Sequence, residues 1–587
     1  MAGTPGRRWQ ATTPAAFAAA AAALPALLAY NVSPSPTFLN QALAFALWGG
    51  FVVLTASAAG RGLWRLNTAL GLMILAAAAS WLFGSLPASL ALASIGTLAA
   101  AALLSVGGNS AAARPDAPSL FAAFSWAWLV AGALCVLVAL TQVFAPGLPD
   151  GKWIAVSGSV GRAVGNMRQP NHLSSLLLWS CIAVVALLEL RRLALRPAAG
   201  LMAAFVFAVV LTASRTGLVS VLLLGLWGLL DRRLDKPTRI LLLCTPLIYA
   251  LSWWGMAQWA TLADHRFGGA ERLAETDISG SRFGIWKNTL ALIQAHPWTG
   301  VGWGEFNLAW TLTPFPGRPT AFFDHTHNLP LQLAVELGLP LASVVLALLL
   351  WALGRAALNA WRSDSDTGLA QRCAVLMVVM IGLHSLLEYP LWYAYFLLPA
   401  AWALGFAVQQ AGPASDSPGG NGQPRWPATR LALLAGGGVL IAGALFSVWD
   451  YSRVTAIFQA KAGDPPLAQR IARGQRSVFF AHHADYAAVT SGVPTATPAN
   501  ADRAFDRVSH YLLDTRLMIA WAKSLAARGE LDPARHLAAR LREFNKADAE
   551  KFFESCPPAA VPAAPGLPFQ CELPDVAQRW QNFVPAR

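Results

Sequence analysis

Residues 14–59, PAAFAAAAAALPALLAYNVSPSPTFLNQALAFALWGGFVVLTASAA, contain two long hydrophobic stretches and no charged side chain. The stretches 14–30 and 38–59 are separated by the polar, proline-containing segment Asn31-Val-Ser-Pro-Ser-Pro36. A helix needs about 20 predominantly apolar residues to cross a bilayer. This region therefore predicts two membrane-spanning helices joined by a short polar loop.

The first predicted helix shares one feature with a cleavable signal peptide, because Arg7 and Arg8 precede it. However, Pro25 interrupts its hydrophobic stretch, and no A-x-A cleavage site follows. We therefore expect a membrane anchor that is retained.

Hydrophobic stretches of this kind recur along most of the 587-residue chain. Hydrophobic residues make up 56% of the chain and charged residues only 12%, whereas soluble domains are about 25% charged. The mean hydropathy is +0.47. An ordinary soluble enzyme, a collagen, a coiled coil and a disordered chain are excluded by this composition. Eleven further predicted spans bring the total to thirteen: 66–83, 87–106, 118–143, 172–190, 198–213, 216–230, 239–259, 329–353, 373–388, 391–410 and 431–449.

The distribution of arginine and lysine predicts how these spans are oriented. The net charge of +13 would suit nucleic acid in a soluble protein, but cytoplasmic loops of membrane proteins collect Arg and Lys, so we predict no nucleic-acid partner. With a cytoplasmic N-terminus, every short Arg-rich loop falls on the cytoplasmic side. The periplasmic side then receives the stretch 144–171, the loop 260–328 and the tail after Asp450.

The tail, residues 451–587, differs in composition from the rest of the chain, because 30 of its 137 residues are charged. Residues 517–529 and 532–541 predict two amphipathic helices around a glycine turn, as in a tetratricopeptide-like hairpin. The predicted fold class is all-α: a polytopic inner-membrane protein with about 13 transmembrane helices, a large periplasmic loop and a helical, soluble C-terminal domain. Residues 1–450 would form the transmembrane domain, including the loop 260–328, and residues 451–587 the periplasmic domain.

The loop 260–328 is too long and too polar to be a simple connector, and loops of this length are usually functional. It ends in Phe323-Asp-His-Thr-His-Asn-Leu-Pro-Leu-Gln332, which continues into a hydrophobic span. His325, His327 and Asn328 suit proton transfer at the mouth of that span, because histidine titrates near neutral pH. Two other interpretations remain: a pair of interface histidines that caps the helix, or a metal site with Asp324, for which His-x-His without a further ligand is weak support.

Two segments precede these histidines in the same loop. Ser281–Leu290 predicts an amphipathic helix with Arg282 in its first turn. His296–Phe306 is a glycine-rich turn, whose backbone N–H groups are of the kind that cradles phosphate. Because the turn lacks a Lys-Ser/Thr pair, it is not a P-loop.

Further polar residues cluster beside the hydrophobic spans. Arg168, Gln169, Asn171 and His172 lie just before one span, and they combine an arginine fork that suits phosphate oxygens with amides that suit sugar hydroxyls. The remaining candidates are ionisable residues close to the bilayer, where such residues are costly unless paired or functional: Arg215, His384 and Glu388.

Six cysteines are present, and only Cys556 and Cys571 lie outside the predicted spans. Because the predicted compartment is oxidising, we expect these two to form a disulfide. No CxxC or Cys/His spacing suggests a metal site.

The assembled pattern resembles the O-antigen ligase superfamily and, within it, the bacterial protein O-oligosaccharyltransferases of the pilin glycosylation (PglL-like) type. The resemblance covers about residues 150–410, and the soluble tail is similar to the C-terminal domain of such enzymes. It rests on five segments in order: Gln169–Leu173, Ala213–Gly217, Ser281-Arg282 with Trp286 and the turn His296–Gly302, His325–Asn328 with Glu336–Gly338, and His384–Tyr393.

The resemblance implies a glycosyltransferase that moves a glycan from polyprenyl (undecaprenyl) pyrophosphate to a hydroxyl acceptor in the periplasm, such as a pilin. It implies that His327 is the essential histidine and that Arg215 and Arg282 hold the pyrophosphate. We expect the other named residues to contribute to substrate binding: Arg168, Gln169, Asn171, His172, His325, Asn328, His384 and Glu388.

The residues fit this chemistry independently. A Ser or Thr hydroxyl needs a general base, and Arg side chains stabilise the negative charge of a departing pyrophosphate. We therefore expect no metal and no cofactor, and besides the lipid-linked glycan and the acceptor protein we expect contact only with membrane lipids.

Two other functions remain open. One is a sister transferase, either the ligase that loads O-antigen onto lipid A-core or the O-antigen polymerase. The other is a transporter or lipid flippase, which predicts polar residues in mid-span and an internal repeat; the sequence has few of the former and no repeat.

Overall fold

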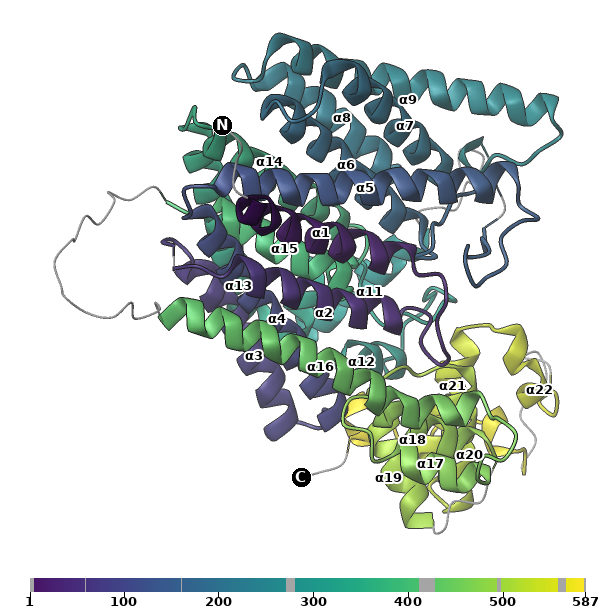
Figure 1. Cartoon of the computed structure of the whole chain (residues 1–587). Coiled ribbons are helices and arrows are strands. Elements are labelled where there is room, and N and C mark those ends of the chain that lie inside the picture. The colour runs from purple at the N-terminus through teal and green to yellow at the C-terminus, as the bar shows by residue number, and fades with distance from the viewer. Residues whose placement is uncertain are drawn as a thin grey trace. The chain divides into compact units, whose positions relative to one another are not determined.

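The computed structural model describes residues 5–58, 60–159, 161–270, 280–410, 428–492, 498–557 and 566–584. Its regular elements within these ranges are all helices (Figure 1). The loop at 411–427, expected on the cytoplasmic side, lies outside the described residues, as does Arg272 of the large loop.

Each stretch predicted to span the bilayer contains a helix. Ten helices in the described ranges are long and apolar enough to cross a membrane, and Thr13–Leu27, α8 and α15 are shorter apolar helices. The all-helical polytopic class is therefore confirmed, whereas the count of thirteen spans stays a prediction. The helices are α1 (Pro5–Leu27), α2 (Phe38–Thr55), α3 (Trp64–Leu82), α4 (Ala88–Ala112), α5 (Ala117–Phe144), α6 (Pro170–Glu189), α7 (Leu195–Thr212), α8 (Arg215–Leu230), α9 (Lys236–Leu262), α13 (Leu329–Trp361), α14 (Asp366–Ser385), α15 (Ala394–Ala407) and α16 (Ala428–Phe458).

The chain forms two compact units. The first consists of residues 1–70, 99–276 and 347–448, and α6 is its central helix. Every residue of α6 from Asn171 to Leu187 is buried, as expected for a helix that is hydrophobic on all sides. It packs against α5, α7, α8 and α14, so the polar residues at its start are held by several neighbours.

Small residues allow α4 and α15 to approach closely in this unit. A Cβ atom added to Gly405 would lie 2.0 Å from the carbonyl oxygen of Ser105, and one added to Gly108 would lie 2.0 Å from that of Trp402. Glycine is therefore required at both positions for the observed distance between the two backbones, as is common where membrane helices pack.

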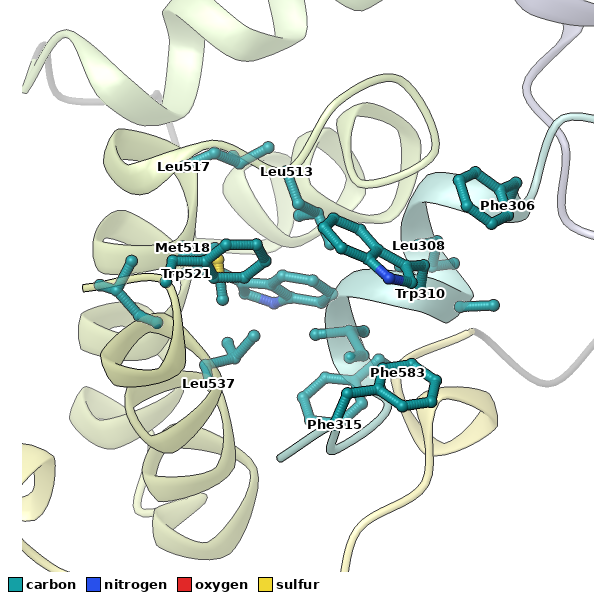
Figure 2. Close-up of a cluster of buried hydrophobic side chains, with 14 of the residues drawn as sticks. Phe306, Leu308, Trp310, Phe315, Leu513, Leu517, Met518, Trp521, Leu537 and Phe583 are labelled. Atoms are coloured by element: carbon teal, nitrogen blue, oxygen red, sulfur yellow. The ribbon is translucent and has the colours of Figure 1, made fainter. Parts of the chain in front are cut away.

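The second unit consists of residues 71–98, 277–346 and 449–587. It combines α11 (Gly280–Ala295) and α12 (Phe306–Leu312) of the large loop with the tail helices. All seven residues of α12 are buried. Its side chains Phe306, Leu308 and Trp310 meet apolar residues of α20 and α21 in one hydrophobic core (Figure 2).

This grouping differs from the division expected from the sequence, which assigned the loop 260–328 to the transmembrane domain. From Ile285 onward the loop shares its core with the tail instead. The physical reason is that α12 is buried on all sides but too short to cross a bilayer, so it packs against the amphipathic tail helices.

The tail itself is helical, and the predicted hairpin is confirmed as α20 followed by α21. Gly529 has φ of 81° in the turn between them, a conformation that glycine adopts without steric cost. The tail helices are α17 (Leu467–Gly474), α18 (Ala481–Thr490), α19 (Pro498–Val508), α20 (Thr515–Ala527), α21 (Leu531–Glu543) and α22 (Glu550–Phe553).

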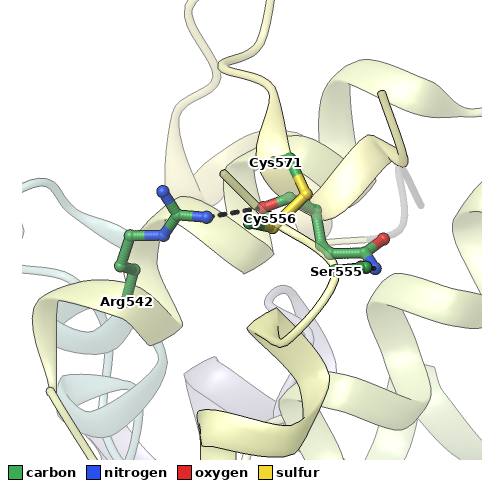
Figure 3. The surroundings of a disulfide bond; sticks show 5 residues. Arg542, Ser555, Cys556 and Cys571 are labelled. Carbon is green, nitrogen blue, oxygen red and sulfur yellow. Dashed lines mark hydrogen bonds between the residues drawn. A yellow bond between two sulfur atoms is a disulfide. The ribbon is translucent and has the colours of Figure 1, made fainter. Parts of the chain in front are cut away.

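A disulfide joins Cys556 to Cys571, with their Cα atoms 5.2 Å apart (Figure 3). Beside it, Arg542 donates a hydrogen bond to the carbonyl of Gln570 at 3.1 Å. The Gln570 side chain donates to the hydroxyl of Ser555 at 3.2 Å. These bonds connect the segment after α22 to α21.

Arg318 fastens the large loop to α21. Its side chain is fully buried, and Nε donates to the Glu543 carboxylate at 2.8 Å. Its other nitrogens donate to the carbonyls of Thr311 and Thr313. Burial lowers the pKa of Arg318 to about 10 against the attraction of Glu543, so the guanidinium stays charged at neutral pH.

Candidate functional site: a histidine turn and a buried polar cluster

The large loop ends in a polar turn, Asp324 to Asn328, at the start of α13. His327 has φ of 55°, a left-handed conformation that costs a non-glycine residue about 1–3 kcal/mol. Its ring packs edge-on against Phe323, with centroids 5.2 Å apart. Oδ1 of Asn328 accepts a hydrogen bond from the N–H of Leu331 at 3.0 Å, so Asn328 caps α13. His327 is thus fixed immediately before a capped helix.

His325 pairs with Asp324 in the same turn. Nδ1 of His325 lies 2.9 Å from Oδ1 of Asp324, whose side chain is 47% exposed. Desolvation alone would raise the pKa of Asp324, but attraction and hydrogen bonding by His325, with a smaller contribution from His327, lower it below its ordinary value. Asp324 is therefore ionised at neutral pH and orients the His325 imidazole.

Thr326, between the two histidines, anchors the turn. Nε1 of Trp286 in α11 donates to the Thr326 carbonyl at 2.9 Å. The Thr326 N–H donates to Oε1 of Gln332 at 2.8 Å, and Nε2 of Gln332 donates to Oε1 of Glu336 at 2.9 Å. These bonds connect α11, the turn and the beginning of α13. Thr326 is buried, and its hydrogen bonds fix the backbone between the two histidines.

The glycine-rich turn at 296–302 contacts the same helix at residues 335–339. Helix α13 is interrupted at Gly338, which has φ of 73° and ψ of 162°, and the interruption frees backbone groups that the turn satisfies. The N–H groups of Val301 and Gly302, which could otherwise bind phosphate, donate to carbonyls of α13 instead. The bonds run from the N–H groups of Val301, Gly302 and Leu339 to the carbonyls of Val335, Glu336 and Pro297, at 2.8, 3.1 and 2.8 Å.

Replacing Gly338 with Ala is expected to destabilise this support. The backbone conformation at Gly338 is essentially restricted to glycine and costs other residues about 1–3 kcal/mol. In addition, the new Cβ would lie 2.4 Å from the carbonyl oxygen of Trp298. Hydrogen exchange at residues 296–302 should become faster. Gly354→Ala is the control, because a Cβ at Gly354 in the same helix meets nothing within 4 Å; equal exchange in the two variants would contradict the role of Gly338.

In the first unit, three of the sequence motifs meet in a buried polar cluster. Oε1 of Gln169 accepts from the N–H groups of Asn171 and His172 at 2.5 and 3.3 Å, so Gln169 caps α6. The Asn171 side chain donates to Oε1 of Glu388 at 3.1 Å and accepts from the Ser214 hydroxyl at 2.8 Å. Asn171, Ser214 and Glu388 are all buried, so their hydrogen bonds fix them relative to one another.

The two histidines of this buried cluster each have a hydroxyl partner. Nδ1 of His172 lies 3.0 Å from the hydroxyl oxygen of Tyr395, and the ring packs edge-on against Tyr393. Nδ1 of His384 lies 2.7 Å from Oγ of Ser175. The two imidazole centroids are 5.9 Å apart. Both histidines are buried, and their partners fix the ring orientations.

The predicted arginines occupy three different settings. Arg168 donates to the carbonyls of Pro36 and Gly151 at 3.3 and 3.4 Å, so part of its fork holds neighbouring loops. Arg215 is exposed at the first residue of α8, where a positive charge opposes the helix dipole. Arg282 is partly exposed in the first turn of α11. Arg168 and Arg215 belong to the first unit and Arg282 to the second.

Three of the motifs share one local design. In each, a non-glycine residue with positive φ precedes a residue whose side chain caps a helix. The positive-φ residues are Arg168, Ala213 and His327, with φ of 57°, 50° and 55°, and the capping residues are Gln169, Ser214 and Asn328. Such strained residues cluster at functional sites, and each of these turns presents a helix N-terminus, which favours anions.

Sequence reasoning missed Ser214, Ser175 and Tyr395 as members of the buried cluster. Tyr395 gave the only local signal, a phenol in a hydrophobic span close to His384 and Glu388. Serines are common in membrane helices, so neither Ser214 nor Ser175 stands out without its partner.

Three family models match parts of the chain. The O-antigen ligase model matches residues 200–346, which include the turn with His327. The protein glycosylation ligase model matches residues 163–188, which include the cap of α6. A model for the C-terminal part of membrane-bound polymerase virulence factors matches residues 373–555. These matches show that the chain is similar to the O-antigen ligase family and to protein glycosylation ligases over parts of its length.

The chain is also similar to two curated O-oligosaccharyltransferases of Acinetobacter baylyi. A general O-oligosaccharyltransferase is 29% identical over 270 residues, which are 42% of this chain and 44% of the relative. A ComP-specific O-oligosaccharyltransferase is 27% identical over 297 residues, which are 49% of this chain and 51% of the relative. The chain thus spans about half the length of the curated relatives it matches.

Proposed function

We propose that this protein is an O-linked oligosaccharyltransferase that moves a glycan from undecaprenyl pyrophosphate to Ser or Thr hydroxyls of acceptor proteins such as pilins. The observation that carries this proposal is the turn at 324–328, where His327 is held in a strained conformation beside the Asp324–His325 pair. The similarity to protein O-oligosaccharyltransferases supports the same reaction and acceptor class.

In the proposed reaction, His327 removes the proton from the acceptor hydroxyl. The hydroxyl oxygen forms a bond to the anomeric carbon of the donor sugar, and the bond from that carbon to the pyrophosphate oxygen breaks. The departing lipid pyrophosphate keeps the electron pair of the broken bond, and Arg215 and Arg282 stabilise its charge. A single displacement of this kind inverts the anomeric configuration. The Asp324–His325 pair contributes to binding the substrate.

The buried cluster of the first unit is proposed to contribute polar groups for the donor. The Asn171 amide, His172, His384 and Glu388 offer hydrogen-bond donors and acceptors of the type that sugar hydroxyls and phosphates use. Gln169 caps α6, Asn328 caps α13 and Arg168 holds the neighbouring loops at Pro36 and Gly151, so these three act by positioning their neighbours.

Arg215→Ala and Arg282→Ala are each expected to raise the KM for the lipid-linked donor. Lysine at either position should restore activity only in part, because a point charge cannot copy the bidentate fork of arginine. Transfer assays with the donor concentration varied would measure this effect. Full activity of both alanine variants at a limiting concentration of donor would contradict the proposal that these arginines bind the pyrophosphate.

The protein is proposed to lie in the bacterial inner membrane, with a cytoplasmic N-terminus and a periplasmic C-terminal domain. The basis is the placement of all short Arg-rich loops on one side of the predicted spans. Alkaline phosphatase fused after residue 460 should therefore be active. If the phosphatase fusion is inactive and green fluorescent protein fused at the same position is fluorescent, the proposed topology is wrong.

A second candidate function is transfer to a carbohydrate acceptor, either as the ligase for lipid A-core or as a polymerase. The matches to the O-antigen ligase and membrane-bound polymerase models favour it. Co-expression with a lipid-linked glycan pathway separates the alternatives. A mass increase of a pilin-type acceptor equal to the glycan supports protein transfer, whereas glycan on lipid A-core or longer glycan chains support the second candidate.

A further inference from the structure

An open hollow of about 490 Å³ lies in the second unit, at the junction of the large loop and the tail. It is a surface depression rather than an enclosed cleft. The residues that matter for its chemistry are Phe322, Tyr486, Asp514, Arg516, Lys546 and Asp548. Phe322 comes from the large loop, only two residues before Asp324, and the others come from the tail.

The two carboxylates of the hollow are already engaged by neighbouring groups. Asp514 caps α20 by accepting from the N–H of Leu517 at 2.9 Å, and it accepts from the Tyr486 hydroxyl at 2.7 Å. Asp548 accepts from the Thr515 hydroxyl at 3.0 Å. These acids therefore have structural roles in holding the wall of the hollow.

The two cations are in a different situation. Across the described ranges, neither Arg516 nor Lys546 has a hydrogen bond or an ion pair with a carboxylate. Arg516 is exposed on α20, and Lys546 lies 5.8 Å from the ring centroid of Phe322. Phe322 is itself held by stacking on Phe544 at 4.2 Å. The hollow thus offers two cationic groups beside a fixed aromatic ring, which suits a carboxylate flanked by apolar groups.

We propose that this hollow binds an acidic segment of the acceptor polypeptide and thereby brings its Ser or Thr to His327. The proposal rests on the proposed function and specifies how that function selects its acceptor. The lining comes from the polar loop and the soluble tail and includes no residue of a hydrophobic span, so it favours a water-soluble ligand over a lipid-borne one. Phe322 and His327 are five residues apart, so their Cα atoms are separated by at most about 19 Å. An extended peptide of about six residues spans that distance.

The test uses the full chain in detergent and two fluorescent serine-containing peptides that differ only by one Asp→Asn replacement. The aspartate peptide should bind more tightly than the asparagine peptide. In the double variant Arg516→Ala/Lys546→Ala, the Kd of the aspartate peptide should rise about tenfold or more, because two charge-assisted contacts are lost. Lys461→Ala/Arg473→Ala is the matched control, since it removes two exposed cations of the same domain that lie away from the hollow.

Several outcomes would overturn the proposal: equal affinity for the two peptides, an unchanged Kd in the double variant, or the same loss in the control. A double variant that binds peptide normally but loses affinity for the lipid-linked glycan would show that the cations serve an acidic sugar instead. His327→Ala separates this proposal from the proposed function, because it should bind peptide normally and yet transfer no glycan. If the wild-type chain prefers the aspartate peptide but transfers no glycan, the proposed transferase function is wrong and the peptide-binding proposal stands.

Discussion

His327→Ala is expected to lower the rate of glycan transfer by about 10²–10⁴-fold, the usual contribution of a positioned general base. In the proposed mechanism, the imidazole takes the proton of a hydroxyl that is a poor nucleophile at neutral pH. Alanine relieves none of the φ strain at position 327 that glycine would relieve, and Thr326 still fastens the turn. The abundance of the protein in the membrane should therefore stay unchanged while transfer is lost.

His325→Ala should cost less than His327→Ala, because His325 is assigned to substrate binding. His265→Ala serves as a control outside the proposed site and should transfer normally; its ring packs against Trp259. If His325→Ala is inactive and His327→Ala is active, His325 is the general base and His327 is not. If both variants stay active, the general-base mechanism at this turn fails.

Arg318→Ala is expected to destabilise the second unit by roughly 2–5 kcal/mol, because two backbone carbonyls lose their donor at about 1–3 kcal/mol each. The replacement leaves the carbonyls of Thr311 and Thr313 without their donor and removes the buried contact with Glu543. The guanidinium also lies 4.6 Å from the ring centroid of Phe544, so packing is lost as well. Hydrogen exchange should accelerate in α12 and α21 together.

Arg528→Ala is the matched control for Arg318→Ala. Arg528 also contacts two carboxylates, those of Asp502 and Glu530, but all three side chains are about one-third to one-half exposed. Surface pairs of this kind contribute roughly 0–1 kcal/mol. An exchange profile in Arg318→Ala that matches the one in Arg528→Ala would contradict the view that the buried arginine fastens the loop to the tail.

The helices could be predicted from the sequence because their signals are local. A run of about 20 apolar residues is recognisable without knowing its neighbours, and the hairpin of α20 and α21 follows from its amphipathic period and Gly529. The two cysteines outside the spans likewise predicted the disulfide that the structure contains.

The partners of polar residues could not be predicted, because they are distant in the sequence. Glu305 and His510 form a buried pair at 2.6 Å although 205 residues separate them. Arg318 and Glu543 are 225 residues apart. No periodicity links such positions, so the packing of the large loop with the tail could not be inferred from the sequence.

The candidate site was predictable in its residue types but not in its geometry. The motifs around Gln169, Arg215 and His327 were recognisable as polar groups beside hydrophobic spans. The positive φ of Arg168, Ala213 and His327 was not, since glycine is the residue that normally indicates such a conformation. The interruption of α13 at Gly338 and its repair by the turn at 296–302 also required coordinates, because both depend on backbone contacts across the loop.

The most direct test of the central claim is transfer by the purified chain in proteoliposomes. These would contain an undecaprenyl-pyrophosphate-linked glycan and a pilin-type acceptor, with lipid A-core supplied in a parallel sample. Intact mass spectrometry should show an acceptor heavier by one glycan with the wild-type chain and no shift with His327→Ala. Glycan found only on lipid A-core, or an equal mass shift with His327→Ala, would contradict the claim that this histidine turn catalyses transfer to protein.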